Sequence, residues 1–268
     1  MRSPGTGGAF DAAIFDMDGL LVDSEPLWHR AEIAVLGALG VPLVASACRE
    51  TKGMFVSEVT RYWFERYPWV GPSTDEVAGD VVDAVMELVV AEGRLQPGVA
   101  QAIGLCRRHA PALAVASSSE YRLIDLVLGH FGLAGEFDLV HSAQDEPFGK
   151  PHPGVFLTAG AKLGARPRHC VVWEDSPAGV LAAKAAQMVC VAVPEAAERD
   201  RREVAVADAV LASLREADED LWERLAAIAG QPPRATTPQA TTPRAHPPQA
   251  TTPPPSPAPA TGVPPRTP

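Results

Sequence analysis

The sequence predicts an α/β fold: a doubly wound, Rossmann-like parallel sheet with a small inserted helical region and a proline-rich C-terminal tail. Three observations lead to this prediction. Short apolar segments alternate with segments of helical periodicity, one long interval lacks any strand pattern, and the composition changes abruptly at Gln231. With 268 residues, 46% of them hydrophobic, the chain is long enough for one large domain or two smaller ones.

Five apolar segments are predicted to be strands buried on both faces. Each is too short and too uniformly apolar to be an amphipathic helix. Segments of helical periodicity lie between them, and this repetition favours a parallel sheet with right-handed crossovers. The predicted strands are Ala12–Phe15, Ala112–Ala116, Leu139–Val140, Val171–Trp173 and Val189–Val193, and the predicted helices between them are Gly98–Ala110, Glu120–Phe131, Pro153–Gly164 and Pro177–Gln187.

The interval after the first strand contains no convincing strand and is predicted to be helical. Helical periodicity occurs there at Leu27–Leu39, Phe55–Tyr67 and Val77–Val90. We therefore expect a helical insertion of residues 26–93 between the two parts of a core domain, residues 10–25 and 94–230.

Two segments carry the capping-box pattern, in which a serine and a glutamate three residues later each bond the other's backbone at a helix start. Ser73–Glu76 has this pattern just before the last helix of the insertion. Ser213–Glu216 repeats it and is predicted to open a final helix that ends near Gly230.

The segment from residue 231 to 268 is rich in Pro, Thr and Ala, has no Asp or Glu, and repeats the unit ATTP. Such a composition cannot bury enough apolar surface to offset the entropy of ordering, so we expect disorder with polyproline II character. The tail is then a spacer or, alternatively, a ligand for a proline-binding module. The sequence identifies no partner for it.

Charge and composition exclude several kinds of partner. The net charge is -10 and there is no Lys/Arg cluster, so nucleic acid and anionic membranes are not expected to bind. No segment approaches the roughly 18 apolar residues of a membrane span, and the N-terminal segment lacks an apolar signal region. The four scattered cysteines are expected to be buried thiols in a reducing cytoplasm.

Two aspartates follow the first predicted strand, in the segment FDMDGLLVDS of residues 15–24. Ligands of open parallel sheets bind at the carboxyl ends of the strands, where Asp16 and Asp18 would lie. Residues two apart on a strand point to the same side, so both carboxylates are expected to face one centre. One ionised carboxylate suits nucleophilic attack and its neighbour suits proton transfer. The pair indicates phosphoryl transfer or ester cleavage.

A turn cap and a calcium site are the two other interpretations of this pair. Aspartates also cap turns, and an EF-hand calcium loop also carries alternating aspartates. The EF-hand pattern fails because its fifth position would be Leu20 and its glycine comes two residues early. Two acids at the end of an apolar strand are costly unless they are used, which favours the functional interpretation.

Polar groups also follow two other predicted strands. Ser117–Ser119 precede a helix and would present hydroxyl and N–H groups to an anion, although a serine N-cap has the same pattern. Lys150, in the stiff segment GKPHP, suits a phosphate group, although a solvated surface lysine is the alternative. His29 and His152 could contact the substrate, but a position at the surface or behind the site is favoured for both.

An acidic pair, Glu174 and Asp175, ends the fourth predicted strand. Together with Asp16 it would form an all-oxygen set of ligands. Such a set suits a hard cation, and Mg²⁺ in particular.

These four motifs, in this order, resemble those of the haloacid dehalogenase-like hydrolase superfamily. Its first motif in the sugar-phosphatase branch, DxDGxLxDS, matches residues 16–24, and the resemblance covers roughly residues 12–229. The segments FDMDGLLVDSEPLWHRAE and GKPHPGVFLTAGAKLG are similar to the hexitol phosphatase or 2-deoxyglucose-6-phosphate phosphatase group. The remaining motifs match Ser117, Lys150, Glu174 and Asp175.

The resemblance implies an Mg²⁺-dependent phosphatase that hydrolyses small hexose or hexitol phosphate monoesters. Asp16 would form an aspartyl-phosphate, and Asp18 would protonate the leaving alcohol and then deprotonate water. Mg²⁺ would lie between the Asp16 carboxylate, the Asp18 backbone carbonyl and the acidic pair. The phosphate would be held by Ser117, the Ser118 N–H and Lys150.

Two further functions stay open. β-Phosphoglucomutases share these motifs but carry an arginine a few residues after a Lys-Gly pair, whereas Lys52-Gly53 is followed here by Met, Phe and Val. The missing arginine favours a phosphatase over a mutase, but it also leaves room for another small ester such as phosphoglycolate. A catalytically idle binding protein would usually lose the nucleophile or the acidic pair, and both Asp16 and Asp175 are present.

Overall fold

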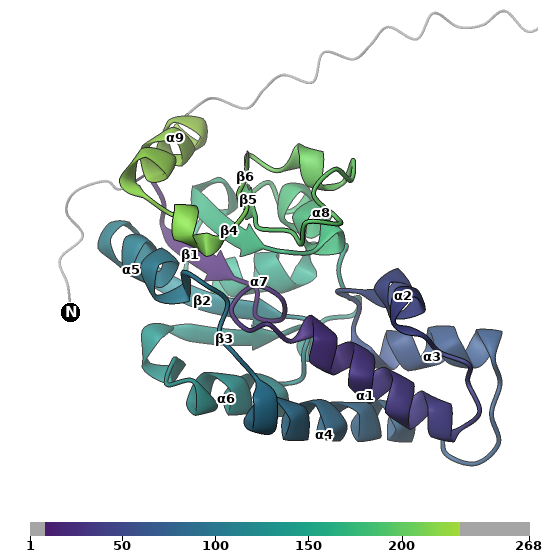
Figure 1. Cartoon of the computed structure of the whole chain (residues 1–268). Helices are drawn as coiled ribbons and strands as arrows, with labels where there is room; N and C mark the ends of the chain where they lie inside the picture. The colour runs from purple at the N-terminus through teal and green to yellow at the C-terminus, as the bar shows by residue number, and fades with distance from the viewer. Residues whose placement is uncertain (1–8, 231–268) are drawn as a thin grey trace, which may run out of the picture. The chain divides into compact units, whose positions relative to one another are not determined.

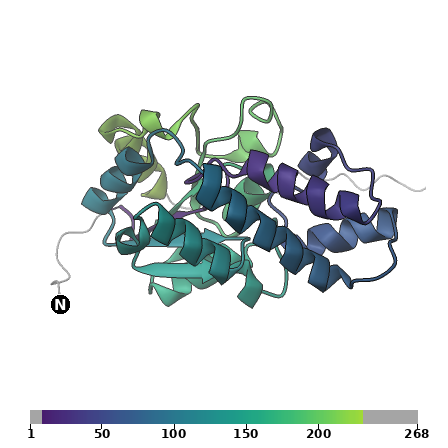
Figure 2. The same ribbon diagram turned by 60° about the horizontal axis from the view of Figure 1, so that its bottom comes forward.

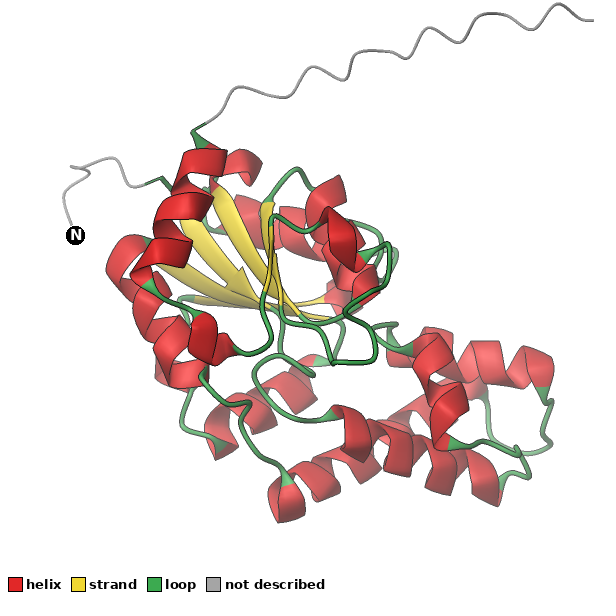
Figure 3. Cartoon of the chain, turned by 45° about the horizontal axis from the view of Figure 1, so that its top comes forward, coloured by secondary structure: helices red, strands yellow, loops and turns green. Residues whose placement is uncertain are grey.

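The computed structural model describes residues 9–230, which belong to the first of two compact units of the chain, Met1–Pro232. The predicted tail, residues 231–268, lies outside the described residues. Within the described part, helices cover both faces of a six-stranded sheet (Figures 1 and 3). Its strands are β1 (Ala12–Phe15), β2 (Ala112–Ser117), β3 (Leu139–Ser142), β4 (Cys170–Glu174), β5 (Val189–Ala192) and β6 (Ala209–Val210).

The sheet is entirely parallel, with the strand order β3-β2-β1-β4-β5-β6. The order reverses at β1, which pairs with β2 on one side and with β4 on the other. In doubly wound sheets the ligand crevice lies at such a reversal, outside the carboxyl ends of the strands. The predicted fold class is confirmed, and the topology locates the crevice at the end of β1.

Alternating side chains of the strands enter two separate cores. Ala13 and Phe15 of β1 belong to one core, where the Phe15 ring stacks on Trp173 of β4 with ring centroids 5.7 Å apart. Ala12 and Ile14 belong to the other core. All four residues of β1 are fully buried, as expected for a central parallel strand.

The helices after the insertion divide between these two faces. Helices α5, α6 and α9 pack on the face with Phe15, and α7 and α8 pack on the opposite face. Their bounds are α5 (Val99–His109), α6 (Tyr121–His130), α7 (Gly154–Lys162), α8 (Pro177–Ala185) and α9 (Glu219–Ala229).

The interval between β1 and α5 is helical, as predicted. Its long helices α1 and α4 pack side by side (Figure 2), and residues including Leu36, Val59 and Trp63 form a small core of their own. The capping box at Ser73 is present, with Glu76 N–H donating to the Ser73 hydroxyl at 3.2 Å. The helices are α1 (Glu25–Ala38), α2 (Ala45–Cys48), α3 (Val56–Arg66) and α4 (Thr74–Glu92).

The start of the final helix was predicted wrongly. Ser213 opens only a single 3₁₀ turn, Leu214–Glu216, and α9 begins at Glu219 with Asp218 as its N-cap. The reason is a tertiary contact. The side-chain amide of Gln101 on α5 donates hydrogen bonds to the carbonyl groups of Arg215 and Ala217, each at 2.8 Å. The two-residue strand β6 and the single-turn helix α2 were not predicted.

The four cysteines are buried and free, which confirms the prediction of buried thiols. Within residues 9–230 there is no helix with the length and apolar character that crossing a membrane requires.

Candidate active site

The carboxyl ends of β1, β2 and β4 bring the predicted polar residues into one pocket. The backbone N–H of Asp16 continues the ladder to the Trp173 carbonyl at 3.0 Å, so Asp16 follows β1 directly. Ser117 is the last residue of β2, and Glu174 is the last residue of β4. The pocket is lined by Asp16, Asp18, Ser117, Ser118, Lys150 and Asp175, among other residues.

Asp18 is held by three hydrogen-bond donors. Its Oδ1 accepts hydrogen bonds from the Ser24 hydroxyl at 2.7 Å and from the Trp28 indole N–H at 2.9 Å. Its Oδ2 accepts from the Ser119 hydroxyl at 2.6 Å. Two of these donors come from the segment that follows β1, and the third comes from the serine loop after β2. The carboxylate is therefore fixed in orientation at the pocket wall.

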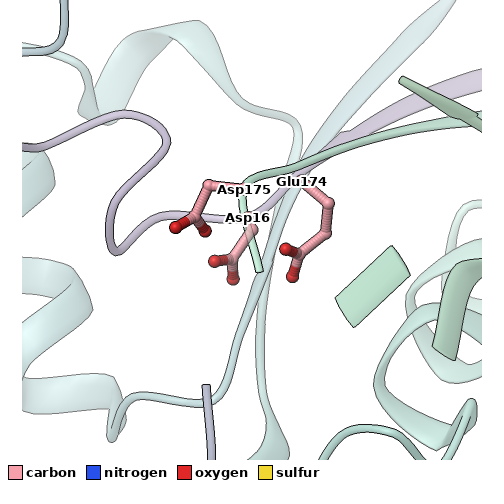
Figure 4. Close-up of side chains that lie close together, drawn as sticks. All are labelled: Asp16, Glu174 and Asp175. Carbon is pink, nitrogen blue, oxygen red and sulfur yellow. The ribbon is translucent and has the colours of Figure 1, made fainter. Parts of the chain in front are cut away.

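Asp16, Glu174 and Asp175 form a buried cluster of carboxylates (Figure 4). One oxygen from each lies within 4.8 Å of the others. The turn after β1 makes this approach possible, because Gly19 has a φ of +77° and a Cβ there would lie 2.2 Å from Asp175 Oδ2. Glycine is therefore required at this position both by the left-handed backbone and by the closeness of Asp175.

Lys150 bridges two members of this cluster. Its ammonium group donates to Asp16 Oδ1 at 2.7 Å and to Glu174 Oε1 at 2.5 Å, and its side chain is almost completely buried. The other oxygen of Glu174 accepts from the backbone N–H and the hydroxyl of Ser176, at 2.7 and 3.0 Å. The alternative of a solvated surface lysine is thereby excluded.

Lys52 also enters the cluster, and sequence reasoning missed it. Its Nζ lies 2.8 Å from Asp175 Oδ2 and 3.0 Å from Glu198 Oε2, and its side chain is 4% exposed. Burial acts to lower the pKa of Lys52, but Asp175 and the other acidic neighbours outweigh burial and raise it. A lone lysine in a helical region carries no sequence signal of such a role.

Burial disfavours the charged forms of the carboxylates in this cluster. Burial raises the pKa of Asp16 well above its ordinary value, and Lys150 offsets part of that rise. Burial also raises the pKa of Asp175 to about 8, against the lowering effect of Lys52. Three carboxylates face two ammonium groups, and Lys52 also pairs with Glu195 and Glu198, so the fully ionised cluster carries an excess of negative charge. A divalent cation would remove this imbalance.

The serine loop joins the core to the insertion. The Ser117 hydroxyl accepts from the Ser119 N–H at 3.1 Å, and the Ser118 hydroxyl donates to the Gly53 carbonyl at 3.0 Å. The N-cap of α6 is Glu120, which makes no side-chain cap bond, so the N-cap interpretation of the serines does not hold. Ser117 and Ser118 instead line the pocket.

One face of α1 also lines the pocket. The lining residues are Glu25, Trp28, His29 and Glu32, so His29 is in the pocket, where the sequence allowed substrate contact but favoured a position at the surface or behind the site. His152 is not among the described residues that line the pocket. The sequence signal was weak, because polar residues on one side of a helix usually face solvent.

Comparison with known proteins agrees with this geometry. A family model described as haloacid dehalogenase-like hydrolase matches residues 10–187. Hexitol phosphatase B of Escherichia coli (strain K12) is 42% identical over 206 residues, which cover 76% of this chain and 93% of that protein.

Solved structures share the fold. CbbY from Rhodobacter sphaeroides, crystallised in complex with phosphate, superposes with a TM-score of 0.68 at 28% identity, covering 77% of this chain and 96% of its own. β-Phosphoglucomutase from Clostridium difficile superposes with a TM-score of 0.72 at 22% identity, covering 81% and 97% of the two chains, and supports the fold alone. The family match spans β1 to α8 and includes every strand end that lines the pocket. The chain therefore belongs to the haloacid dehalogenase-like hydrolase family and is an enzyme of that family.

Proposed function

We propose that this enzyme is an Mg²⁺-dependent phosphatase that hydrolyses small hexose or hexitol phosphate monoesters through an aspartyl-phosphate. The observation that carries the proposal is the buried group of Asp16, Lys150, Glu174 and Asp175 at the reversal point of the sheet. The 42% identity to hexitol phosphatase B supports the choice of substrate class.

The acidic cluster fits a magnesium ion. Asp16, Glu174 and Asp175 offer only oxygen ligands, and Oδ1 of Asp175 is buried without a hydrogen-bond partner. Together with the backbone carbonyl of Asp18, these residues would hold the ion. Bound there, Mg²⁺ would neutralise charge that builds on the phosphoryl oxygens.

In the first step Asp16 attacks phosphorus while Asp18 gives its proton to the leaving alcohol oxygen. In the second step Asp18 takes a proton from water, and the water oxygen attacks phosphorus and releases the Asp16 carboxylate. The Ser24 and Ser119 hydroxyls beside Asp18 can rotate to suit either protonation state, because each can donate or accept. Ser117, the Ser118 N–H and Lys150 hold the phosphate.

The insertion has a place in this proposal as a cap. We propose that residues 26–93 form a cap domain over a core of residues 10–25 and 94–230, because the pocket is lined from both regions. Caps of this kind exclude water and help to set specificity. A cytoplasmic location stays a prediction, which the four buried free thiols support.

The test is phosphate release, with and without Mg²⁺, from sorbitol 6-phosphate, 2-deoxyglucose 6-phosphate, glucose 6-phosphate, β-glucose 1-phosphate and phosphoglycolate. We expect Mg²⁺-dependent release from the hexose or hexitol esters, complete loss in Asp16→Asn, and normal turnover in the control Asp80→Asn, an exposed residue of α4. Substantial activity of Asp16→Asn would exclude it as the nucleophile. Conversion of β-glucose 1-phosphate to glucose 6-phosphate without release would show a mutase, and release from phosphoglycolate alone would change the substrate class.

A further inference from the structure

The pocket-lining face of α1 contains groups that the proposed phosphoryl transfer does not use. Glu25, Trp28, His29 and Glu32 follow the spacing i, i+3, i+4 and i+7, which places side chains on one side of a helix. Trp28 bonds Asp18, and Glu25 lies 3.9 Å from Lys52, so both belong to the surroundings of the acidic cluster. Among residues 9–230, neither His29 nor Glu32 forms a hydrogen bond or ion pair with a residue of that cluster, and His29 lies 3.6 Å from Glu25.

Glu32 is buried with one oxygen unpaired. The residue is 6% exposed, and its Oε2 is buried without a hydrogen-bond partner. No Lys or Arg among residues 9–230 forms an ion pair with it, and its neighbour is the Cys48 thiol. Burial raises the pKa of Glu32 to about 7. A buried acceptor left unpaired costs free energy, which a ligand with hydroxyl donors would remove.

His29 offers a second unpaired group on the same helix face. Its Nε2 is buried without a hydrogen-bond partner, since the nearest carboxylate oxygen, Oε2 of Glu25, is 3.6 Å away. Burial lowers the pKa of His29, which favours the neutral ring, and a neutral imidazole nitrogen either donates or accepts. The pocket wall also includes the apolar side chains of Val56 and Val59.

We propose that Glu32 and His29 form a subsite that binds hydroxyl groups on the carbon chain of the substrate. A polyhydroxylated chain matches these lining residues, because it supplies hydroxyl donors for Glu32, a donor or acceptor for His29, and C–H surface for the valines. An ester without hydroxyl groups leaves both polar groups unpaired. The inference rests on the proposed function, which places the phosphoryl group at Asp16.

The experiment compares Glu32→Met with wild-type full-length enzyme in Mg²⁺, using sorbitol 6-phosphate, glucose 6-phosphate and p-nitrophenyl phosphate. Methionine keeps the length of the side chain but cannot accept these hydrogen bonds. We expect kcat/KM for the hydroxylated esters to fall about 10- to 100-fold, the usual effect of losing a hydrogen bond to a charged or strongly polar group. For p-nitrophenyl phosphate, the fall in kcat/KM should be at least about tenfold smaller, because this ester has no hydroxylated carbon chain for Glu32 to bind.

Two controls separate recognition from folding. Glu65→Met, at an exposed position of α3, should leave both kinds of substrate unaffected. The Tm of Glu32→Met should be at or above the wild-type value, because the change removes an unpaired buried oxygen. Should the methionine variant fail to fold, Glu32→Leu takes its place, because leucine cannot accept these hydrogen bonds either, and a selective loss on the hydroxylated esters is again the expected result.

The outcomes are distinct. Equal losses on all substrates, or no loss on any, would overturn the subsite. Wild-type enzyme that cleaves p-nitrophenyl phosphate but neither hydroxylated ester would also overturn it, while leaving the phosphatase chemistry intact. Wild-type enzyme that is inactive on all three would instead contradict the proposed function.

Discussion

Replacing Glu32 with glutamine should change how the stability of the protein depends on pH. The pKa of the buried Glu32 is raised from 4.5 to about 7 by burial. Between these values the unfolded chain has lost the proton while the folded protein keeps it, so the free energy of unfolding falls as the pH rises. The stability contribution of this group is complete below about pH 4.5 and is lost once the pH passes about 7.

The size of the effect follows from the shift. A difference of about 2.5 between the two pKa values corresponds to about 3 kcal/mol, at about 1.4 kcal/mol for each pKa unit. Glutamine has nearly the same shape and does not titrate. The stability of Glu32→Gln relative to wild type should therefore increase by about 3 kcal/mol between pH 4.5 and pH 7.5.

The assay is urea unfolding of both proteins across this pH range, in EDTA so that bound metal does not contribute, with tryptophan fluorescence as the signal. Asp16 and Asp175 titrate in both proteins, so their contributions cancel in the difference. Glu65→Gln, at the exposed position on α3, should follow wild type throughout. A stability difference that does not vary with pH would show that Glu32 is ionised in the folded protein, and the argument for an unpaired buried carboxyl would fail.

Two further predictions concern the acidic residues. Asp18→Asn should lower kcat/KM for sorbitol 6-phosphate about 100-fold more than for p-nitrophenyl phosphate, because the p-nitrophenyl leaving group needs little protonation. Equal losses of kcat/KM on the two esters would argue against proton transfer by Asp18. Gly179→Ala should weaken the response to Mg²⁺, because its Cβ would lie 1.7 Å from Glu174 Oε1 and must displace that carboxylate. A magnesium titration of activity checks this, with Gly129→Ala, which has open space, as the control; an unchanged titration would mean that Glu174 is not a ligand.

The core of the fold and most of the candidate site could be predicted because both depend on local patterns. Buried parallel strands read as short apolar segments, and the residues that end such strands must meet at one edge of the sheet. This rule was enough to bring Asp16, Ser117 and Asp175 into one pocket, although Asp16 and Asp175 lie more than 150 residues apart in the chain. Lys150 lies in the loop after β3, and only its place in the order of the motifs indicated its role.

The features that the sequence did not predict depend on tertiary contacts. Lys52 follows a short 3₁₀ turn and has no pattern of its own, and its burial against Asp175 depends on how the insertion packs on the core. The start of α9 depends on Gln101, which lies more than 100 residues away and bonds the carbonyls that a helix from Ser213 would need. Neither contact is encoded in a local segment.

The α1 face shows why substrate recognition is harder to predict than chemistry in this fold. A phosphoryl-transfer site needs fixed residue types at strand ends, so its motif is readable, whereas a hydroxyl-binding face needs only polar residues at helical spacing, which most surface helices also have. What distinguishes Glu32 and His29 is that one polar atom of each, Oε2 and Nε2, is buried without a hydrogen-bond partner, a property of the packed structure. Substitutions on this face should therefore redirect the enzyme among phosphate esters, while substitutions at the strand ends should abolish turnover of all of them.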